Sequence, residues 1–121
     1  MHEKTMMKYW RKAVLWVNKN TCIICGLKQP SDMLECHHVV PRRNVFLRYD
    51  WRNGVCVCVG HCHRAAHTKK GERLLSAKHP HYDYLLEHEN IRIKDWLVKT
   101  GQTRDEFQEG ELVELRAVMG R

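Results

Sequence analysis

The first regular hydrophobic pattern in the chain spans residues 5–19. Met6, Trp10, Val14 and Val17 recur every three or four residues, which places them on one stripe of a helix. This spacing predicts an N-terminal amphipathic helix whose apolar stripe packs inward. Its basic face either contacts phosphate groups or is simply solvated, and the pattern favours neither interpretation. That face carries Lys8, Arg11, Lys12 and Lys19.

Two strand-like segments follow, with a turn between them. Residues 35–40 are rich in strand-forming side chains, and residues 55–59 alternate valine and cysteine. Residues 50–54 end in Asn-Gly, which is a strong turn signal. Residues 62–70 then have helical character, and Gly71 predicts the end of that helix. The predicted order is therefore strand, loop, strand, helix.

The last part of the chain, residues 71–121, predicts further helices. His79-Pro80 interrupts any helix that continues from the preceding segment, and residues 81–99 fit an amphipathic helix. The sequence Thr103-Arg104-Asp105-Glu106 is a capping box that predicts the start of a short helix, and residues 111–118 predict a final one. We expect these helices to wrap around the core, with a surface for a protein partner as the alternative.

Composition limits the class of protein. The chain has 121 residues, 43% hydrophobic and 29% charged, which is typical of a folded globular chain of one domain. No apolar run approaches the roughly 18–20 residues of a transmembrane helix. The charged first residues lack the apolar segment of a secretory signal. These observations predict a cytoplasmic protein without membrane association.

Charge divides the chain into two unlike parts. Lys and Arg number 21 against 14 Asp and Glu, for a formal net charge of +7. Residues 1–70 hold 13 of the basic and 4 of the acidic residues, and all six cysteines, so the remainder is slightly acidic. A basic surface attracts an anionic partner, and nucleic acid is the leading candidate.

The cysteine spacing predicts a zinc site. Two residues separate Cys22 from Cys25, which lets one turn direct both thiolates at a tetrahedral ion, and a reducing cytoplasm keeps thiols free for metal. Three residues separate Cys58 from Cys62, a spacing that zinc tolerates. We therefore predict a four-cysteine structural zinc site, with ordinary reduced cysteines as the alternative.

Other residues compete for places in that site. His61 could replace Cys62, and Cys56 lies two residues before Cys58, on the same face of a strand. We interpret Cys36 and Cys56 as small buried residues, which is the commoner role of a free cysteine. The spacing alone leaves these alternatives open.

Paired histidines predict a second centre. Because neighbouring strand residues face opposite ways, one of His37 and His38 can bind a metal ion while the other addresses a water molecule or a substrate. His63 and His67 lie four residues apart on the predicted helix and share a face, a spacing that can hold one metal ion. The pattern favours a catalytic site over a larger structural metal site.

In this order the motifs resemble the signature of HNH endonucleases, and more narrowly of the small zinc-containing HNH nucleases of bacteriophages and prophages. The resemblance covers about residues 20–70. It is carried by Cys22-Ile-Ile-Cys25-Gly26, Glu35-Cys36-His37-His38-Val39-Val40-Pro41-Arg42, Asp50-Trp51-Arg52-Asn53-Gly54-Val55, Cys58, Cys62-His63 and His67. The departure is the three-residue gap between Cys58 and Cys62, where relatives usually have two residues.

The resemblance implies an α+β fold with a ββα-metal, treble-clef-like core and a zinc knuckle. Residues 1–121 would form a single HNH nuclease domain. Residues 1–20 would be the N-terminal helix, 21–70 the zinc-bound ββα-metal core and 71–121 a helical C-terminal extension.

The resemblance also implies residue roles. His37, His63 and His67 match the ligands of one catalytic divalent ion. His38 matches the general base that takes a proton from the attacking water, and Asn53 matches the middle residue of the motif, which holds the loop between the strands.

The expected activity is metal-dependent nicking or cutting of DNA. Three imidazoles suit Zn²⁺, Ni²⁺ or Co²⁺ and accept Mn²⁺, whereas relatives are often active with Mg²⁺ or Mn²⁺. The alternative function is a catalytically inactive zinc-knuckle module that binds DNA.

Phage relatives are encoded beside DNA-packaging genes, so packaging proteins are expected partners. Four arginines are expected to contact the DNA backbone, with a merely solvated rim as the alternative: Arg42, Arg43, Arg52 and Arg64.

Overall fold

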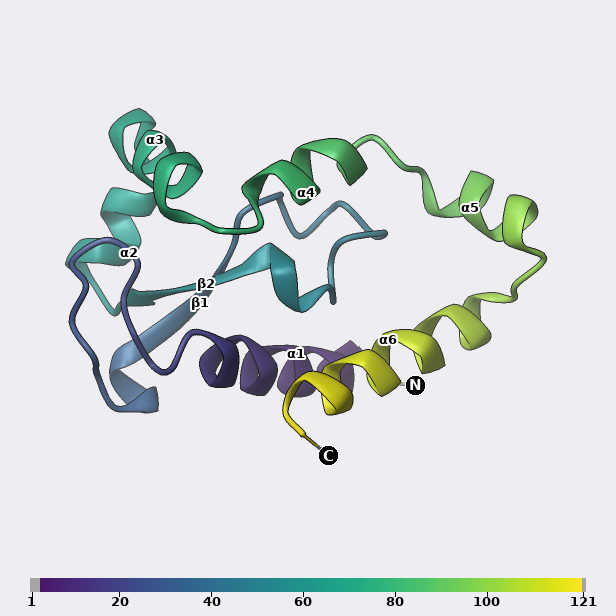
Figure 1. Ribbon diagram of the computed structural model, residues 1–121, viewed down its shortest axis with the longest axis horizontal. Coiled ribbons are helices and arrows are strands. Elements are labelled where there is room, and N and C mark those ends of the chain that lie inside the picture. The colour runs from purple at the N-terminus through teal and green to yellow at the C-terminus, as the bar shows by residue number, and fades with distance from the viewer. Residues whose placement is uncertain (1–2, 121) are drawn as a thin grey trace.

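The computed structural model of the protein describes residues 3–120, so Met1, His2 and Arg121, at the ends of the predicted terminal segments, lie outside the described residues. A small antiparallel sheet lies among helices, which confirms the α+β class (Figure 1). Two 3-10 turns, η1 (Ser31–Met33) and η2 (Trp51–Asn53), precede the strands. The helices and strands are, in order, α1 (Glu3–Val17), β1 (Leu34–His38), β2 (Gly54–Cys58), α2 (His61–Ala66), α3 (Lys69–Lys78), α4 (Tyr82–His88), α5 (Ile93–Thr100) and α6 (Arg104–Val118).

The sheet pairs β1 with β2 in a register that places His37 opposite Val55 and His38 opposite Gly54. The strands lie where the sequence predicted them, within two residues. β1 ends earlier than expected because the backbone after His38 leaves the sheet, and the N–H of Val39 donates to the carbonyl of Asn53 at 3.2 Å. The two histidines therefore stand at the end of the strand, beside the loop that joins it to β2.

Helix α1 packs on the sheet through the stripe that the sequence predicted. Met6, Trp10 and Val14 are buried, whereas Val17 is only half-buried at the end of the helix. A Cβ at Gly54 would overlap the side chains of Val14 and Trp10, so glycine is required there for the helix and strand to approach. The core of the protein therefore lies between α1 and β2.

The helix predicted from residue 62 to Gly71 is in fact two helices. α2 ends at Ala66, and the Thr68 side chain caps α3 by accepting a hydrogen bond from the Gly71 N–H at 3.0 Å. Gly71 lies in the first turn of α3, where a Cβ would overlap the backbone at Ala65. The prediction that Gly71 ends a helix was therefore wrong: its lack of a side chain serves close packing instead.

The C-terminal helices also differ from the prediction. Residues 81–99 form two helices, α4 and α5, and residues 111–118 continue the helix that starts after Thr103, so α6 is one helix of 15 residues. The capping box is confirmed, since the Thr103 hydroxyl and the Glu106 carboxylate each accept the other residue's N–H at 3.1 Å.

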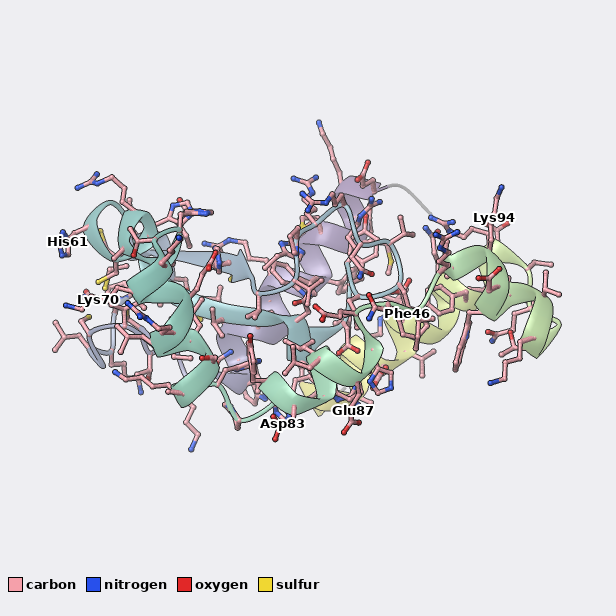
Figure 2. All side chains as sticks on the ribbon, turned by 90° about the horizontal axis from the view of Figure 1, so that it is seen from above. Phe46, His61, Lys70, Asp83, Glu87 and Lys94 are labelled. Carbon is pink, nitrogen blue, oxygen red and sulfur yellow. The ribbon has the colours of Figure 1, made fainter. Side chains whose placement is uncertain are left out.

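Helix α6 returns to lie along α1 (Figure 1). Leu112 and Leu115 are buried in the same apolar cluster as Trp10, so this helix covers the core as expected. Viewed from above, His61 and Lys70 lie at one end of the molecule and Lys94, on α5, at the other (Figure 2). Within residues 3–120 no helix is long and apolar enough to cross a membrane.

A buried carboxyl group lies on the inner face of α6. Glu111 contributes to the wall of a cavity of about 270 Å³ whose other walls include Tyr49, Tyr84 and Trp96. Among residues 3–120 its buried Oε2 atom has no hydrogen-bond partner. Burial, and then the negative charge of Asp50, raise the pKa of Glu111 to about 8. The neutral acid is therefore the form that the fold favours at neutral pH.

This buried acid predicts a pH-dependent stability. The pKa of Glu111 is about 8 in the folded protein against an ordinary value of 4.5, so unfolding releases a proton between these values and stability falls as the pH rises. The loss is about 1.4 kcal/mol per pH unit across that window. We expect Glu111→Gln to flatten the profile when unfolding by urea is measured from pH 5 to 9.

The matched control is Glu109→Gln, which changes an exposed carboxylate on the same helix. It should leave the profile as in the wild type. Parallel profiles for wild type and Glu111→Gln would contradict the prediction.

Candidate functional site

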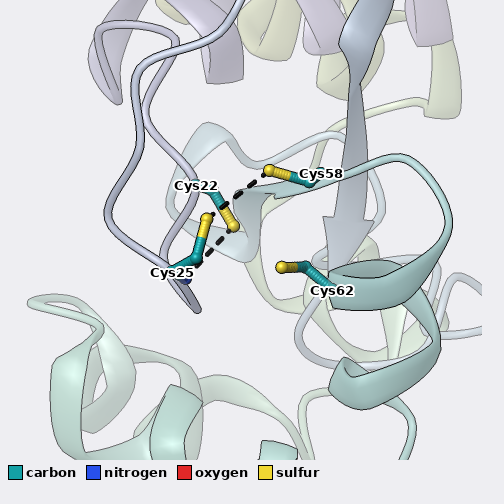
Figure 3. Close-up of side chains that lie close together, drawn as sticks. All are labelled: Cys22, Cys25, Cys58 and Cys62. Atoms are coloured by element: carbon teal, nitrogen blue, oxygen red, sulfur yellow. Dashed lines mark hydrogen bonds between the residues drawn. The ribbon is translucent and has the colours of Figure 1, made fainter.

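Four cysteines converge at one end of the sheet. Cys22 and Cys25 lie in the loop after α1, Cys58 ends β2, and Cys62 lies in the first turn of α2 (Figure 3). Their Sγ atoms all lie within 4.8 Å of one another, and those of Cys25 and Cys58 are 3.6 Å apart. Gly26 has a φ of +76°, the left-handed conformation that closes the turn after the first pair. The four sulfurs thus surround one point.

The pKa values of these thiols bear on whether the cluster can hold a cation. Burial raises the pKa of Cys22, but N–H donors from Cys25 and Cys58 outweigh it and lower the pKa to about 7. Burial, and then contact with the neighbouring thiols, raise the pKa of Cys58 to about 12. Four thiolates so close together repel one another unless a positive ion lies between them, so the donor set fits a structural Zn²⁺ ion.

The structure distinguishes the predicted cysteines from their competitors. His61 does not belong to this group of potential ligands, and neither does Cys56. The Sγ of Cys56 faces the carbonyl of Val14 at 3.9 Å, in the core, and that of Cys36 faces the carbonyl of Arg11 at 3.7 Å. The one-residue departure in the Cys58–Cys62 spacing is therefore absorbed without displacing Cys62.

Three histidines converge on the other side of α2. His37 comes from β1, His63 from α2 and His67 from the residue that caps its end, and their ligating nitrogens lie within 4.8 Å of one another. The Nε2 atoms of His63 and His67 are 3.3 Å apart, and the ring centroids of His37 and His67 are 4.8 Å apart. The four-residue spacing of His63 and His67 thus places both rings against His37.

The protonation state of His37 suits metal binding. Burial, and then the charges of the neighbouring His67 and His63, lower its pKa to about 4. Its imidazole is therefore neutral at physiological pH and offers a lone pair. Three imidazoles around one point fit a divalent first-row transition metal ion such as Zn²⁺, Co²⁺ or Ni²⁺.

His38 does not belong to this three-histidine group and has its own support. Its Nε2 lies 2.9 Å from the carbonyl oxygen of Arg48, and because a carbonyl only accepts, Nε2 carries the proton and Nδ1 keeps a free lone pair. The ring stacks on the indole of Trp10, with centroids 3.9 Å apart and planes at 7°. Burial lowers the pKa of His38, although the Arg48 carbonyl opposes this, so the neutral base is favoured.

Asn53 holds the loop between the strands. Its side chain is fully buried, and its Oδ1 accepts from the N–H of Val40 at 2.7 Å. Its Nδ2 donates to the carbonyls of Val40 and Leu47 at 3.0 and 3.2 Å. The Asn53 amide thus links the backbone at Val40 to the backbone at Leu47, within the loop next to His38.

A cleft of about 670 Å³ joins the histidines. His38 and the three-histidine cluster all contribute to its lining, together with Arg42 at its rim. The cleft therefore combines a neutral imidazole, a potential metal site and a guanidinium group.

The four arginines singled out from the sequence occupy different surroundings. Arg42 is exposed at the cleft and lies 3.8 Å from the Glu3 carboxylate, and Arg64 is exposed on α2. Arg43 is also exposed, but it lines a separate hollow beside Glu89. Only Arg42 thus lines the histidine cleft.

Arg52 is paired with residues of the protein itself. Its guanidinium bonds to Asp50 at 3.2 Å and to Glu114 at 2.8 Å, and it lies over the ring of Tyr84 at 4.6 Å. The group is bound within the fold, where it connects the loop to α4 and α6. The single positive charge of its guanidinium is already shared between two carboxylates, and a contact of Arg52 with DNA stays a prediction.

Sequence reasoning missed the two residues that hold His38. Trp10 was expected only as part of an apolar stripe, and the carbonyl of Arg48 carries no side-chain signal at all. Both contacts join residues that are distant in the chain, 28 residues apart for Trp10 and 10 for Arg48. No local pattern could have indicated them.

Residues 22–69 match the family model described as HNH endonuclease. No curated protein and no solved structure matches the chain. The matched segment contains the four-cysteine cluster, the three-histidine cluster, His38 and Asn53. The chain is therefore similar to HNH endonucleases over these residues.

The cysteine cluster predicts a specific effect of metal loss. We expect Cys62→Ser to lose one zinc ion per chain and to lower the melting temperature by roughly 10 °C or more, because a structural zinc site contributes directly to folding. Zinc content is measured by elemental analysis after dialysis, and melting by circular dichroism.

Cys36→Ser is the matched control, since Cys36 lies on β1 outside the cluster. It should keep the metal content of the wild type. Equal zinc content in wild type and Cys62→Ser would refute the four-cysteine site.

Proposed function

We propose that the HNH domain makes this protein a metal-dependent DNA endonuclease that hydrolyses phosphodiester bonds by nicking or cutting. One observation carries the proposal: a neutral His38, with Nε2 bound to a carbonyl and Nδ1 free, shares a cleft with three converging imidazoles. Hydrolysis of a phosphodiester needs a base for water and a centre that stabilises developing negative charge. The cleft offers residues suited to each.

His38 would act as the general base. Its Nδ1 lone pair accepts the proton of the attacking water, and the Arg48 carbonyl stabilises the imidazolium that forms, because it already accepts the Nε2 proton. Asn53 acts indirectly by holding the loop that carries this carbonyl, through its bond to Leu47. Both residues were expected in these roles from the resemblance.

His37, His63 and His67 would hold the catalytic ion. A divalent ion bound there supplies Lewis-acid stabilisation of the scissile phosphate and of the leaving oxygen. The imidazole donors favour Zn²⁺, Ni²⁺, Co²⁺ or Mn²⁺ over Mg²⁺, which prefers oxygen ligands. The four-cysteine cluster would hold the separate structural Zn²⁺ and fix the start of α2, where His63 lies.

Arg42 and Arg64 are the proposed contacts to the DNA backbone, with Arg43 as an outer contact. Arg42 lies on the cleft and Arg64 follows His63 directly, and both are exposed. The basic half of the chain supports the same conclusion. Contacts of this kind bind phosphates without reading sequence.

The alternative is an inactive DNA-binding module with the same fold. The arrangement of His38 favours the enzyme, because binding alone does not need an imidazole with one nitrogen fixed and the other free beside a metal-binding cluster. A cytoplasmic setting, a bacteriophage origin and a link to DNA packaging stay predictions that rest on the sequence and the family resemblance.

Removal of the proposed base tests the activity. We expect the purified protein to nick supercoiled plasmid when supplied with a divalent ion, and His38→Ala to lower the rate by at least about 10²-fold while DNA binding persists. Cleavage is followed on agarose gels across Mg²⁺, Mn²⁺, Ni²⁺, Co²⁺ and Zn²⁺, and binding by fluorescence anisotropy.

His61→Ala is the matched control, because His61 is an exposed histidine of α2 outside both clusters. It should cleave as the wild type does. Equal cleavage by His38→Ala and wild type would overturn the assignment of the base, and an absence of cleavage with every ion would favour the binding module.

The arginine contacts predict a change in salt dependence. Arg42→Ala and Arg64→Ala should each weaken binding to unrelated DNA sequences equally and reduce the slope of log K against log salt by about 0.9. Titrations at several salt concentrations measure this slope. Arg92→Ala, an exposed arginine at the start of α5, should leave it unchanged; an equal loss in all three variants would refute specific contacts.

A further inference from the structure

The imidazole of His38 lies flat on the indole of Trp10. The ring centroids are 3.9 Å apart and the planes differ by 7°, which is close face-to-face contact. Trp10 belongs to α1, outside the segment that matches the HNH family model. The proposed base is therefore supported by a helix that precedes the matched domain.

The indole is itself fixed on several sides. Trp10 is 2% exposed, and its Nε1–H donates to the backbone carbonyl of Asp50 at 2.8 Å. Gly54 leaves room for its ring edge, because a Cβ there would approach Trp10 Cζ2 at 2.8 Å. Few other orientations of this ring are compatible with the packing, so it presents a rigid plane to His38.

The Arg48 carbonyl alone does not fix the plane of the His38 ring. A single hydrogen bond sets the position of Nε2, but the imidazole can still turn about the line from Nε2 to the carbonyl oxygen. Such a rotation would move Nδ1, the atom that is to accept the proton of water. Contact with a flat, immobile ring prevents it.

We propose that Trp10 is a positioning residue for the general base, which holds the plane of the His38 imidazole so that Nδ1 keeps its direction. The inference rests on the proposed endonuclease function. Trp10 is not among the residues that line the cleft, so it acts through His38 and not through DNA. Its loss should lower kcat and leave DNA binding and KM unchanged, since misplacing a reacting group by about 1 Å can cost about 10²-fold.

Two substitutions separate this role from simple filling of the core. Trp10→Phe and Trp10→Leu both shorten the side chain and remove the hydrogen bond to Asp50, but only phenylalanine keeps a flat face under His38. We expect Trp10→Leu to lower kcat by about 10²-fold and Trp10→Phe to keep most of it. A purely structural role would predict losses that follow the melting temperature in both variants.

The control is Trp16→Leu, which changes an exposed tryptophan of the same helix, 63% accessible. It should leave kcat as in the wild type. A Trp10→Met variant replaces Trp10→Leu if the latter does not fold, because methionine fills irregular space without a flat face.

A spectroscopic measurement tests the stacking without cleavage. The carbon-bound ring protons of His38 should appear upfield of their usual NMR positions in the wild type because of the indole ring current. The upfield shift should be lost in the Leu or Met variant and partly kept in Trp10→Phe. Assignment of these signals uses His38→Ala, in which they disappear.

The outcomes separate this inference from the proposed function. Wild-type kcat in a folded Leu or Met variant, with His38→Ala inactive, overturns the positioning role and leaves the endonuclease intact. Equal losses in the Phe and Leu variants also overturn it, as does an unshifted His38 signal in the wild type. If the wild type cleaves no DNA with any ion, the proposed function fails and the positioning role fails with it.

Discussion

A two-stranded sheet is too small to keep its own shape in water, and this constraint governs the rest of the structure. The protein holds β1 and β2 at three places. The cysteine cluster joins the end of β2 to the loop after α1, the buried amide of Asn53 closes the loop between the strands, and α1 covers one face. Each of these restraints also positions a residue of the candidate site. The contacts that stabilise the sheet are therefore the same ones that position the side chains of the site.

The short helix α2 serves both clusters. Cys62 and His63 are consecutive, and adjacent residues of a helix point in directions about 100° apart, so one faces the cysteines and the other faces His37 and His67. The helix has only six residues and would not form alone. Its position therefore depends on the sulfur cluster at its start and on the packing of α3, which the glycine at position 71 allows.

The sequence predicted the elements and residues that depend on short spacing. The cysteine pair at 22 and 25, the His63 and His67 pair and the capping box at Thr103 are each contained in five residues or fewer, so local geometry decides them. The order of strand, loop, strand and helix along the sequence was also sufficient to predict how the core is built. Roles of the individual site residues stay predictions, since geometry shows proximity and not reaction.

The break between α2 and α3 was missed although its signals are local: Thr68 caps α3, and Gly71 packs against the backbone of Ala65, six residues before it. Features that depend on distant contacts could not be predicted. Arg52, which is basic and close to Asn53 in the sequence, is bound within the fold by such contacts. Its partner Glu114 lies 62 residues away, and only the returning α6 brings the two together.

Asp50 connects parts of the chain that have little else in common. Its backbone carbonyl accepts from Trp10 of α1, and its side chain receives the Tyr84 hydroxyl of α4 at 2.6 Å and the guanidinium of Arg52, which in turn binds α6. Three separate helices thus meet at one residue of the loop that supports the base. Local opening of the C-terminal helices would accordingly disturb the loop beside the cleft. The amide protons of these helices should therefore exchange with solvent together with those of the core, as one cooperative unit.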